Sequence, residues 1–354
     1  MRTVRVAIVG FGFVGQGVYN ILQERREEYK AAYQMDVHVH KVLVNQLHKE
    51  NRTLPTGFDP SLLTDTYTDI FPSFPQSAGA KNPNAIDYVF ECSVGEEPAF
   101  SYLKAALEEG ASVITANKVM FASHMTTLQT LAKEINDRLL QEGADRDKLV
   151  RVGFEATVAG GVPIIKMIQR MLPTQKVNKV EGILNGTTNF ILSDMREHLS
   201  EKKSYESSLK EAQEKGYAEA DPFNDVSGKD AFYKLMILSQ LCFGKMPKWE
   251  EVEVVGIQDI TSDAIAAAQD NGQQRYRHVA SITKEGEVLK GKVTPQLVSP
   301  THSLHGVEGS TNAIAVHCDY LNCITVLGPG AGSYPTGSAM VEDFLSMESL
   351  KRGY

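Results

Sequence analysis

Short apolar runs alternate with amphipathic stretches along the first half of the chain. Residues 4–9 are rich in Val and Ile with little polar alternation, which is typical of a parallel strand buried on both faces. Helical spacing follows at residues 16–29, and a second strand-like run covers residues 37–44. Residues 85–91, 98–109 and 113–115 then predict a strand, a helix and a strand. This alternation predicts an α/β fold with a doubly wound parallel sheet of the Rossmann type.

The pattern changes towards the middle of the chain. Residues 45–80 are rich in Asn, Pro, Ser and Thr, which indicates loops and short elements over the sheet edge. A charged helical stretch at residues 133–148 and an apolar run at 150–154 mark a candidate domain boundary near residue 150. Beyond it we expect helices at 163–171, 190–199 and 228–243, strands at 177–184, 251–255 and 277–290, and an acidic loop at 216–227. The second domain is therefore expected to mix helices and strands in an α+β arrangement.

Composition narrows the class of protein. The chain has 354 residues, enough for two domains of ordinary size. Its net charge of -8 disfavours nucleic acid as a partner, because phosphate backbones are bound by clustered Lys and Arg. No run reaches the roughly 20 apolar residues of a membrane span, and no secretory signal is recognisable. The four cysteines form no CxxC pair, which favours reduced thiols. We expect a cytoplasmic protein that acts on small molecules.

Three glycines, Gly10, Gly12 and Gly15, follow the first predicted strand as GxGxxG. In this position the pattern predicts a dinucleotide site, because glycines allow a tight turn, close approach of the backbone to pyrophosphate, and close helix packing. The N-terminus of the helix that follows favours the anionic phosphates. A purely structural glycine turn is the alternative, and the strand before the motif makes it the weaker one.

The end of the second predicted strand bears on the choice between NAD and NADP. An acidic residue there binds the ribose 2′-hydroxyl, whereas a cation accommodates a 2′-phosphate. This chain has Asn45 at that point, followed by His48, Lys49 and Arg52. NADP is thus permitted and a strict NAD preference is not supported. Ordinary solvated loop charges are the alternative interpretation of the three cations.

Two groups of ionisable residues suggest acid–base chemistry. Lys118 ends the sequence TANK after a strand of the nucleotide domain, where ligands of open parallel sheets bind, although a lone lysine there is more often a surface residue. Asp230 and Lys234 lie four residues apart, so a helix places them on one face. A surface ion pair is one interpretation. The other is a proton-transfer lysine, because Phe232, Leu235 and nearby apolar residues would remove water from its ammonium.

A third cluster is rich in glycine. Residues 328–332 read GPGAG, and a short amphipathic stretch follows at 338–347. Glycine at this density indicates backbone that approaches another group closely, with a plain turn as the alternative.

These clusters together make the chain similar to homoserine dehydrogenases, which interconvert L-aspartate 4-semialdehyde and L-homoserine with a nicotinamide cofactor. The resemblance covers nearly the whole chain and is carried by the following motifs: GFGFVG at 10–15, TANK at 115–118, FEATVAGGVPII at 154–165, LNGTTNFIL at 184–192, GYAEADP at 216–222, DVSGKDAFYKL at 225–235 and GPGAGSYPT at 328–336. It implies three parts: residues 1–150 bind the dinucleotide, 151–310 form the catalytic and dimerisation domain, and 311–354 return to the first domain.

The resemblance also implies roles for single residues. Lys234 would donate the proton to the carbonyl oxygen and Lys118 would assist at the same oxygen. Glu219 and Asp230 would hold the amino-acid part of the substrate, whose α-ammonium needs carboxylate partners, with Asp225 in support. The following residues would lie near NADP or NAD: Gly10, Gly12, Phe13, Val14, Gly15, Ser93, Lys118, Gly216 and Gly332. A monovalent cation, sodium, would be held mainly through the backbone by the following residues: Glu155, Val158, Gly160 and Val162.

Two departures from the family pattern qualify these expectations. Asn45 and Gln46 stand where many relatives carry Arg or Asp, which leaves the cofactor choice open. The chain also stops soon after Asp343, so we expect no regulatory ACT domain. A homodimer is the family expectation. Two other functions stay open: a related dehydrogenase of another amino aldehyde or keto acid, and a dinucleotide sensor without catalysis, against which the presence of both lysines argues.

Overall fold

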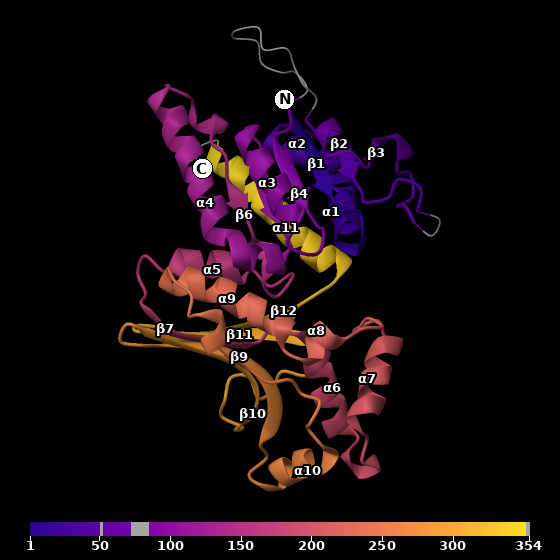
Figure 1. The fold of residues 1–354 in the computed structure, drawn as a ribbon, viewed down its shortest axis with the longest axis vertical. Coiled ribbons are helices and arrows are strands. Elements are labelled where there is room, and N and C mark those ends of the chain that lie inside the picture. Colours follow the sequence, from indigo (N-terminus) through magenta and orange to yellow (C-terminus); the bar gives the residue numbers. More distant parts are fainter. Residues whose placement is uncertain (50–51, 72–84, 352–354) are drawn as a thin grey trace. The chain divides into compact units, whose positions relative to one another are not determined.

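The structure, a computed structural model, describes residues 1–49, 52–71 and 85–351. The chain packs into two compact units, of which the first is Met1–Thr157 with Gly332–Tyr354 and the second is Val158–Ala331. None of the helices in the described part of the chain combines the length and apolar character needed to cross a bilayer. Each unit has its own sheet (Figure 1).

The first unit is built on a parallel sheet with the strand order β3-β2-β1-β4-β5-β6. Its strands are β1 (Arg2–Val9), β2 (Met35–Leu43), β3 (Leu63–Thr64), β4 (Tyr88–Glu91), β5 (Ser112–Thr115) and β6 (Val152–Gly153). The order runs outward in both directions from β1 and β4, which is the doubly wound arrangement. The predicted fold class of this part is confirmed.

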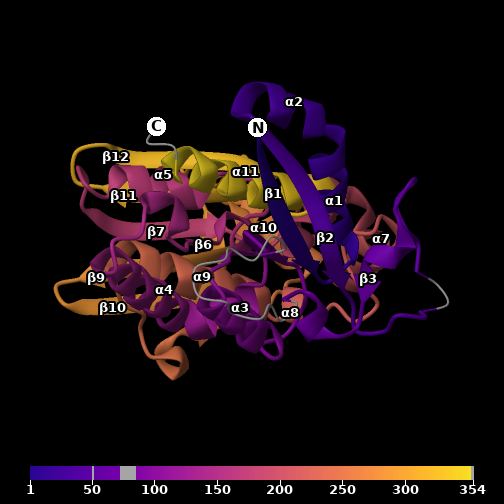
Figure 2. The same cartoon turned by 90° about the horizontal axis from the view of Figure 1, so that it is seen from above.

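Helices cover both faces of this sheet (Figure 2). They are α1 (Phe13–Glu24), α2 (Arg26–Tyr33), α3 (Ala99–Glu108), α4 (Lys118–Gln141) and α11 (Ser333–Lys351). On one face, α1 and α11 share a hydrophobic core with alternate residues of β1 and β4. Phe344 of α11 packs edge-on against the rings of Tyr88 and Phe90. The C-terminal helix is therefore part of the first unit's core.

Two helices of the first unit differ from the sequence prediction. The helix expected at 16–29 is divided at Arg25 into α1 and α2. The helix expected at 133–148 begins at Lys118, because the Asn117 side chain accepts a hydrogen bond from the Met120 amide and caps it. It ends at Gln141, just before Gly143, whose φ of +79° is left-handed. The region expected to hold loops and short elements over the sheet edge at 45–80 does so in its described part, which contains the edge strand β3 and two short 3₁₀ turns. Residues 50–51 and 72–80 lie outside the described residues.

The second unit contains a mixed sheet with the order β12-β11-β7-β9-β10-β8. Its strands are β7 (Val177–Ile183), β8 (Glu253–Val254), β9 (Arg275–Glu285), β10 (Val288–Val298), β11 (Thr311–Cys318) and β12 (Asn322–Pro329). Only β8 and β10 pair in parallel among these strands. The expected single strand at 277–290 is wrong: the chain reverses near Gly286, where φ is +60°, and forms the β9–β10 hairpin. Residues 311–329 also differ from expectation, because they form two strands of this sheet and the chain re-enters the first unit only at Gly332.

Helices pack on this sheet and beside it (Figure 1). They are α5 (Ile164–Met171), α6 (Gly186–Glu197), α7 (Tyr205–Glu214), α8 (Phe223–Val226), α9 (Lys229–Phe243) and α10 (Ser262–Asp270). α9 lies against β7, β9 and β10, so its inward face is buried. α6, α7 and α10 form a separate cluster around Ile191 and Met195. The predicted α+β character of the second domain is confirmed.

Candidate active site

The glycine loop between β1 and α1 has the space that a dinucleotide requires. Gly10 has a left-handed φ of +85°, and a Cβ there would lie 2.9 Å from the Cys92 carbonyl. A Cβ on Gly15 would lie 2.1 Å from the Gly10 carbonyl oxygen, so neither position accepts a larger residue. A Cβ on Gly12 would meet nothing within 4 Å, so the main chain there is open to a ligand. The loop is therefore closely packed at Gly10 and Gly15, and its main chain is accessible to a ligand at Gly12.

The start of α1 suits an anion. Gly12 is its N-cap and supplies no side-chain hydrogen bond, so the first backbone N–H groups are available to a phosphate. Phe13 is 72% exposed and Val14 is half-buried. These residues fit the pyrophosphate of NAD or NADP, whose nicotinamide would supply hydride transfer.

The C-terminal segment reinforces the same loop. Gly332 has a φ of +133° and leads into α11, whose Ser333 hydroxyl donates to the Phe13 carbonyl oxygen at 2.6 Å. A Cβ on Gly17 would lie 2.2 Å from the Ser333 carbonyl oxygen. The residue after Gly332 therefore contacts the glycine loop and α1 within the first unit.

The first two polar side chains of the loop after β2 are uncharged. Asn45 and Gln46 are exposed, and so are His48 and Lys49. Arg52 donates to the main-chain carbonyl oxygens of Gln46 and Leu47 at 2.5 and 3.1 Å. Its guanidinium thus holds the loop's own backbone, which weakens the case for Arg52 as a 2′-phosphate ligand.

Ser93 and Lys118 follow the ends of β4 and β5, at the carboxyl edge of the parallel sheet. The Ser93 amide and hydroxyl both donate to the carboxylate of Glu91, at 2.7 and 2.5 Å. Lys118 is half-buried and is the first residue of α4. Ligands of open α/β sheets bind at this edge, so the position of both residues agrees with a cofactor site.

In the second unit, Lys234 of α9 is held by two acceptors. Its ammonium donates to Asp230 Oδ2 and to the Leu184 carbonyl oxygen, both at 2.7 Å. Lys234 is 9% exposed and Asp230 is 6% exposed. The predicted pair is therefore formed, and its burial rules out the interpretation as a surface ion pair.

Asn185 joins this pair to a second carboxylate. Its side-chain amide donates to Asp230 Oδ2 at 3.0 Å and to Asp225 Oδ1 at 2.8 Å. Its Oδ1 accepts from the Thr188 amide and caps α6. Thr187 donates to the Tyr217 carbonyl oxygen at 2.6 Å, which connects the start of α6 to the loop between α7 and α8. Asn185 and Thr187 were not singled out from the sequence, although both lie in the LNGTTNFIL motif.

Glu219 and Gly216 lie on the exposed loop between α7 and α8. Gly216 has a φ of +75°, and the Glu219 carbonyl oxygen accepts from the Gln213 side chain at 3.1 Å. The Glu219 side chain is exposed to solvent. Glu219 is thus available to a ligand, whereas Asp230 is already committed to Lys234 and Asn185.

The segment expected to hold a cation covers residues 155–162 of the chain. Glu155 is completely buried, and Val158, Gly160 and Val162 are buried as well. Gly160 has a φ of +52°, and a Cβ there would lie 2.6 Å from the Gly330 carbonyl oxygen. No group of three or more His, Cys, Asp or Glu side chains in the described residues is placed to hold a metal. A cation bound here would depend on main-chain oxygens beside one carboxylate, and the sodium site remains a prediction.

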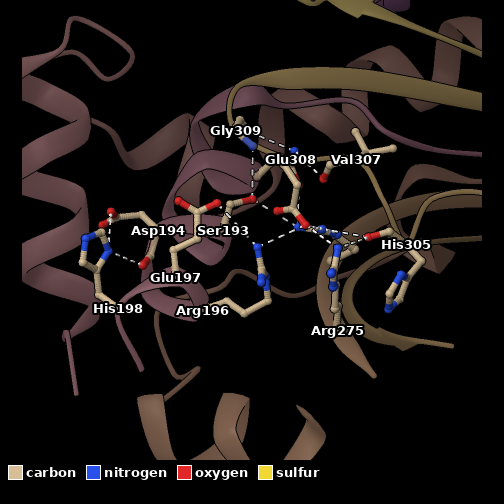
Figure 3. Close-up of polar contacts among 12 residues, drawn as sticks. Ser193, Asp194, Arg196, Glu197, His198, Arg275, His305, Val307, Glu308 and Gly309 are labelled. Carbon is tan, nitrogen blue, oxygen red and sulfur yellow. Dashed lines mark hydrogen bonds and ion pairs between the residues drawn. The ribbon is translucent and has the colours of Figure 1, made fainter. Parts of the chain in front are cut away.

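A partly buried ion network lies at the other end of α6 (Figure 3). This arginine cluster consists of Arg196, Arg275 and Arg277 around Glu308, with N···O distances of 3.2, 2.5 and 2.7 Å. Arg277 also donates to Ser193 and to the His305 carbonyl oxygen. Burial lowers the pKa of Arg277, and Glu308 opposes that shift. The cluster fastens the loop 305–309 to α6 and β9, and the sequence did not reveal it.

A parallel sheet with a glycine loop at its switch point, together with a buried lysine–carboxylate pair, defines a dinucleotide-binding oxidoreductase. Comparisons with known proteins specify it further. The family model "Homoserine dehydrogenase, NAD binding domain" matches residues 10–142, and the model "Homoserine dehydrogenase" matches residues 163–345. The chain belongs to the homoserine dehydrogenase family.

Relatives agree with this assignment. The chain is 35% identical to the homoserine dehydrogenase of Bacillus subtilis (strain 168), covering 100% of this chain and 75% of the relative. A solved homoserine dehydrogenase from Thiobacillus denitrificans has a TM-score of 0.83 and 32% identity, covering 99% of this chain and 74% of that one. A hyperthermophilic archaeal homoserine dehydrogenase in complex with NADPH has a TM-score of 0.75 and 26% identity, with coverages of 99% and 98%.

Proposed function

We propose that this chain catalyses the NAD(P)-dependent interconversion of L-homoserine and L-aspartate 4-semialdehyde. The observation that carries the proposal is the buried Lys234 ammonium, held by Asp230 and the Leu184 carbonyl oxygen in a chain of this family. An ammonium has three N–H donors, and within the described residues two of them have an acceptor. The third is available to a substrate oxygen.

Lys234 delivers its proton to the carbonyl oxygen while negative charge develops there during aldehyde reduction. In the opposite direction the neutral amine accepts the proton of the alcohol. Lys118 assists at the same oxygen, and its cationic charge stabilises the developing alkoxide. Gly10, Gly12 and the start of α1 would hold the pyrophosphate of NAD(P), whose nicotinamide would accept or donate the hydride when bound.

The substrate's amino-acid end requires groups of opposite charge. Glu219 binds the α-ammonium as a solvent-accessible carboxylate, and Asp230 contributes from the buried side. Asp225 acts through Asn185, which it shares with Asp230. The exposure of the two carboxylates supports this division of roles, because the Glu219 side chain is exposed to solvent and the Asp230 side chain is buried.

We further propose that the segment with Glu155, Val158, Gly160 and Val162 binds a monovalent cation, sodium, through backbone oxygens. The buried Glu155 carboxylate and the tight turn at Gly160 support this part. Ser93, Phe13, Val14, Gly216 and Gly332 complete the cofactor-binding set. The enzyme is proposed to act as a cytoplasmic homodimer.

Initial rates of L-homoserine oxidation, measured with NAD and with NADP in parallel, test the reaction and the cofactor together. We expect homoserine-dependent formation of reduced cofactor with at least one of the two. A protein that reduces NAD(P) only with other amino alcohols or hydroxy acids would be a related dehydrogenase instead. Cofactor binding without turnover of any such substrate would make the chain a dinucleotide sensor.

A further inference from the structure

A buried glutamate lies close to the segments that follow β1, β4 and β5, which belong to the proposed cofactor site. Glu91 is the last residue of β4, and its side chain is completely buried. The roles proposed above do not use it. A buried carboxyl group is costly unless it is fully hydrogen-bonded, so its partners indicate what it does.

Both carboxylate oxygens of Glu91 accept hydrogen bonds. Oε1 accepts from the Ser93 amide at 2.7 Å and from the Ser93 hydroxyl at 2.5 Å. Oε2 accepts from the Thr115 hydroxyl at 2.6 Å, at the end of β5. Burial raises the pKa of Glu91, and the bonds from Ser93 and Thr115 oppose that rise. One side chain therefore connects the ends of two neighbouring parallel strands.

The direction of the hydrogen bond from Thr115 is fixed by Asn117, two residues further along the chain. The Asn117 amide donates to Thr115 Oγ1 at 2.9 Å, so the Thr115 hydroxyl hydrogen is directed at Glu91. Asn117 in turn caps α4 and donates from its side chain to the Gly95 carbonyl oxygen at 2.7 Å. The network thus extends from Glu91 to the first turn of α4, where Lys118 begins the helix.

The same network touches the glycine loop. A Cβ on Gly10 would lie 2.9 Å from the Ser93 nitrogen and from the Cys92 carbonyl, so these backbones are in close contact. In a sheet of this strand order the half with β1–β3 takes the adenosine end of a dinucleotide, and the half with β4–β6 takes the other mononucleotide. Glu91 lies in that second half, where the nicotinamide end would bind.

We propose that Glu91 is a positioning residue for the nicotinamide end of the cofactor, acting through Ser93 and through Thr115 and Asn117. The proposal rests on the proposed NAD(P) site. It predicts a loss of affinity that depends on the nicotinamide ring itself. A residue that only stabilised the fold would weaken every ligand of the site alike.

Two kinds of variant disturb the network at different points. Glu91→Gln replaces one of two acceptors by a donor, so it cannot satisfy both the Ser93 amide and the Thr115 hydroxyl. Thr115→Val keeps the volume and removes the hydroxyl, and Thr115→Ser is the matched control that retains it. The Thr115 pair keeps the proposal testable if Glu91→Gln does not fold.

The measurement is the dissociation constant of the full-length protein for NADH and for ADP-ribose, which lacks only the nicotinamide; the 2′-phosphorylated pair is used if the wild type prefers NADP. We expect Glu91→Gln and Thr115→Val to weaken NAD(P)H binding about tenfold, as expected for loss of a hydrogen bond to a charged group. ADP-ribose binding should change less than about twofold, and Thr115→Ser should resemble the wild type in both.

Equal weakening of both ligands, or of neither, overturns the proposal. So does a Thr115→Ser protein that behaves like Thr115→Val. These binding measurements need no turnover, so they are independent of the proposed reaction. A wild type that binds NAD(P)H but does not oxidise homoserine contradicts the proposed function and leaves the role of Glu91 to be decided by the variants.

Discussion

The second unit contains a buried lysine–carboxylate pair, Lys234 with Asp230, and a partly buried arginine cluster, which differ in what their cations can do. In the arginine cluster, Arg277 has a side chain only 1% exposed and binds Glu308, Ser193 and a main-chain oxygen. A guanidinium remains protonated in proteins, so this network can only hold structure. Lys234 has a side chain that is 11% exposed, and a lysine can release its proton. Burial of a charge does not by itself indicate a catalytic centre. The proposed role of Lys234 also requires access to the substrate and a proton that can be transferred.

Replacing Lys234 should have the largest effect on activity. Lys234→Ala removes the proposed general acid, which typically contributes roughly 10²–10⁴-fold, so turnover should fall by that order. Lys234→Arg is the matched control, because it keeps the charge but cannot give up a proton at neutral pH. It should not restore turnover. Initial rates with saturating homoserine and cofactor measure both variants.

Cofactor affinity shows whether the Lys234 variants lose activity through the chemical step or through a disturbed fold. Both variants should bind NAD(P)H within about twofold of the wild type, because Lys234 is not assigned to the cofactor. Near-normal turnover in Lys234→Ala, or full activity in Lys234→Arg, would show that a proton from this side chain is not needed. In either case the comparison with Arg277 would lose its basis.

Replacing Arg277 should have the opposite effect: it should lower the unfolding free energy and leave turnover largely unchanged. Arg277→Met removes one of three cations from Glu308, which is partly exposed and keeps Arg196 and Arg275. The unfolding free energy should therefore fall by less than the ~3–5 kcal/mol that breaking a fully buried ion pair costs. Urea denaturation measures this loss, and the double variant Arg277→Met with Glu308→Gln should recover part of it. Turnover of the folded protein should change less than about tenfold. A stable Arg277→Met protein that has lost turnover would place the arginine cluster in the active site.

The fold of the first unit was largely predictable from local pattern. Parallel strands buried on both faces give continuous Val and Ile runs, and β1 has that pattern because both of its faces are covered. The start of α4 was missed because one side chain, Asn117, determines it by capping. The β9–β10 hairpin was missed because the two residues between the strands include only one glycine, Gly286, in an otherwise strand-like run.

The candidate site was predictable only in part, because side chains from distant segments build it. Asp230 and Lys234 were found because they share one helical face. Asn185 lies 45 residues from Asp230 in the chain, and no local pattern connects them. Glu91 was missed for a similar reason: its partner Thr115 lies on the next strand. Pairings of this kind depend on sheet order, which a sequence pattern does not contain.

A smaller effect should come from the exposed carboxylate. Glu219→Gln removes a proposed charge-assisted contact to the substrate ammonium, so kcat/KM for homoserine should fall roughly 10–100-fold, mainly through KM. Glu214→Gln is the control, because it makes the same charge change at an exposed position of α7. Steady-state kinetics at varied homoserine measure both. Unchanged kinetics in Glu219→Gln would leave Asp230 as the proposed carboxylate partner, and equal effects in both variants would indicate a general electrostatic cause.

The smallest expected effect is on the pH dependence of stability, and it comes from a buried histidine of the second unit. His278 is 2% exposed, and burial lowers its pKa to about 4, although its bond to the Val255 carbonyl oxygen opposes the shift. The unfolded chain therefore binds more protons between about pH 4 and 6.5, and this contribution to stability is present above pH 6.5 and lost as the pH falls. From this group alone, the unfolding free energy should be about 1.4 kcal/mol lower at pH 5.5 than at pH 7.5. His278→Gln retains a donor for Val255 and should lack this component, so urea titrations of both proteins at the two pH values isolate it. An equal pH dependence in both proteins would show that folding does not lower the pKa of His278, and that its burial does not hold it neutral at pH 5.5.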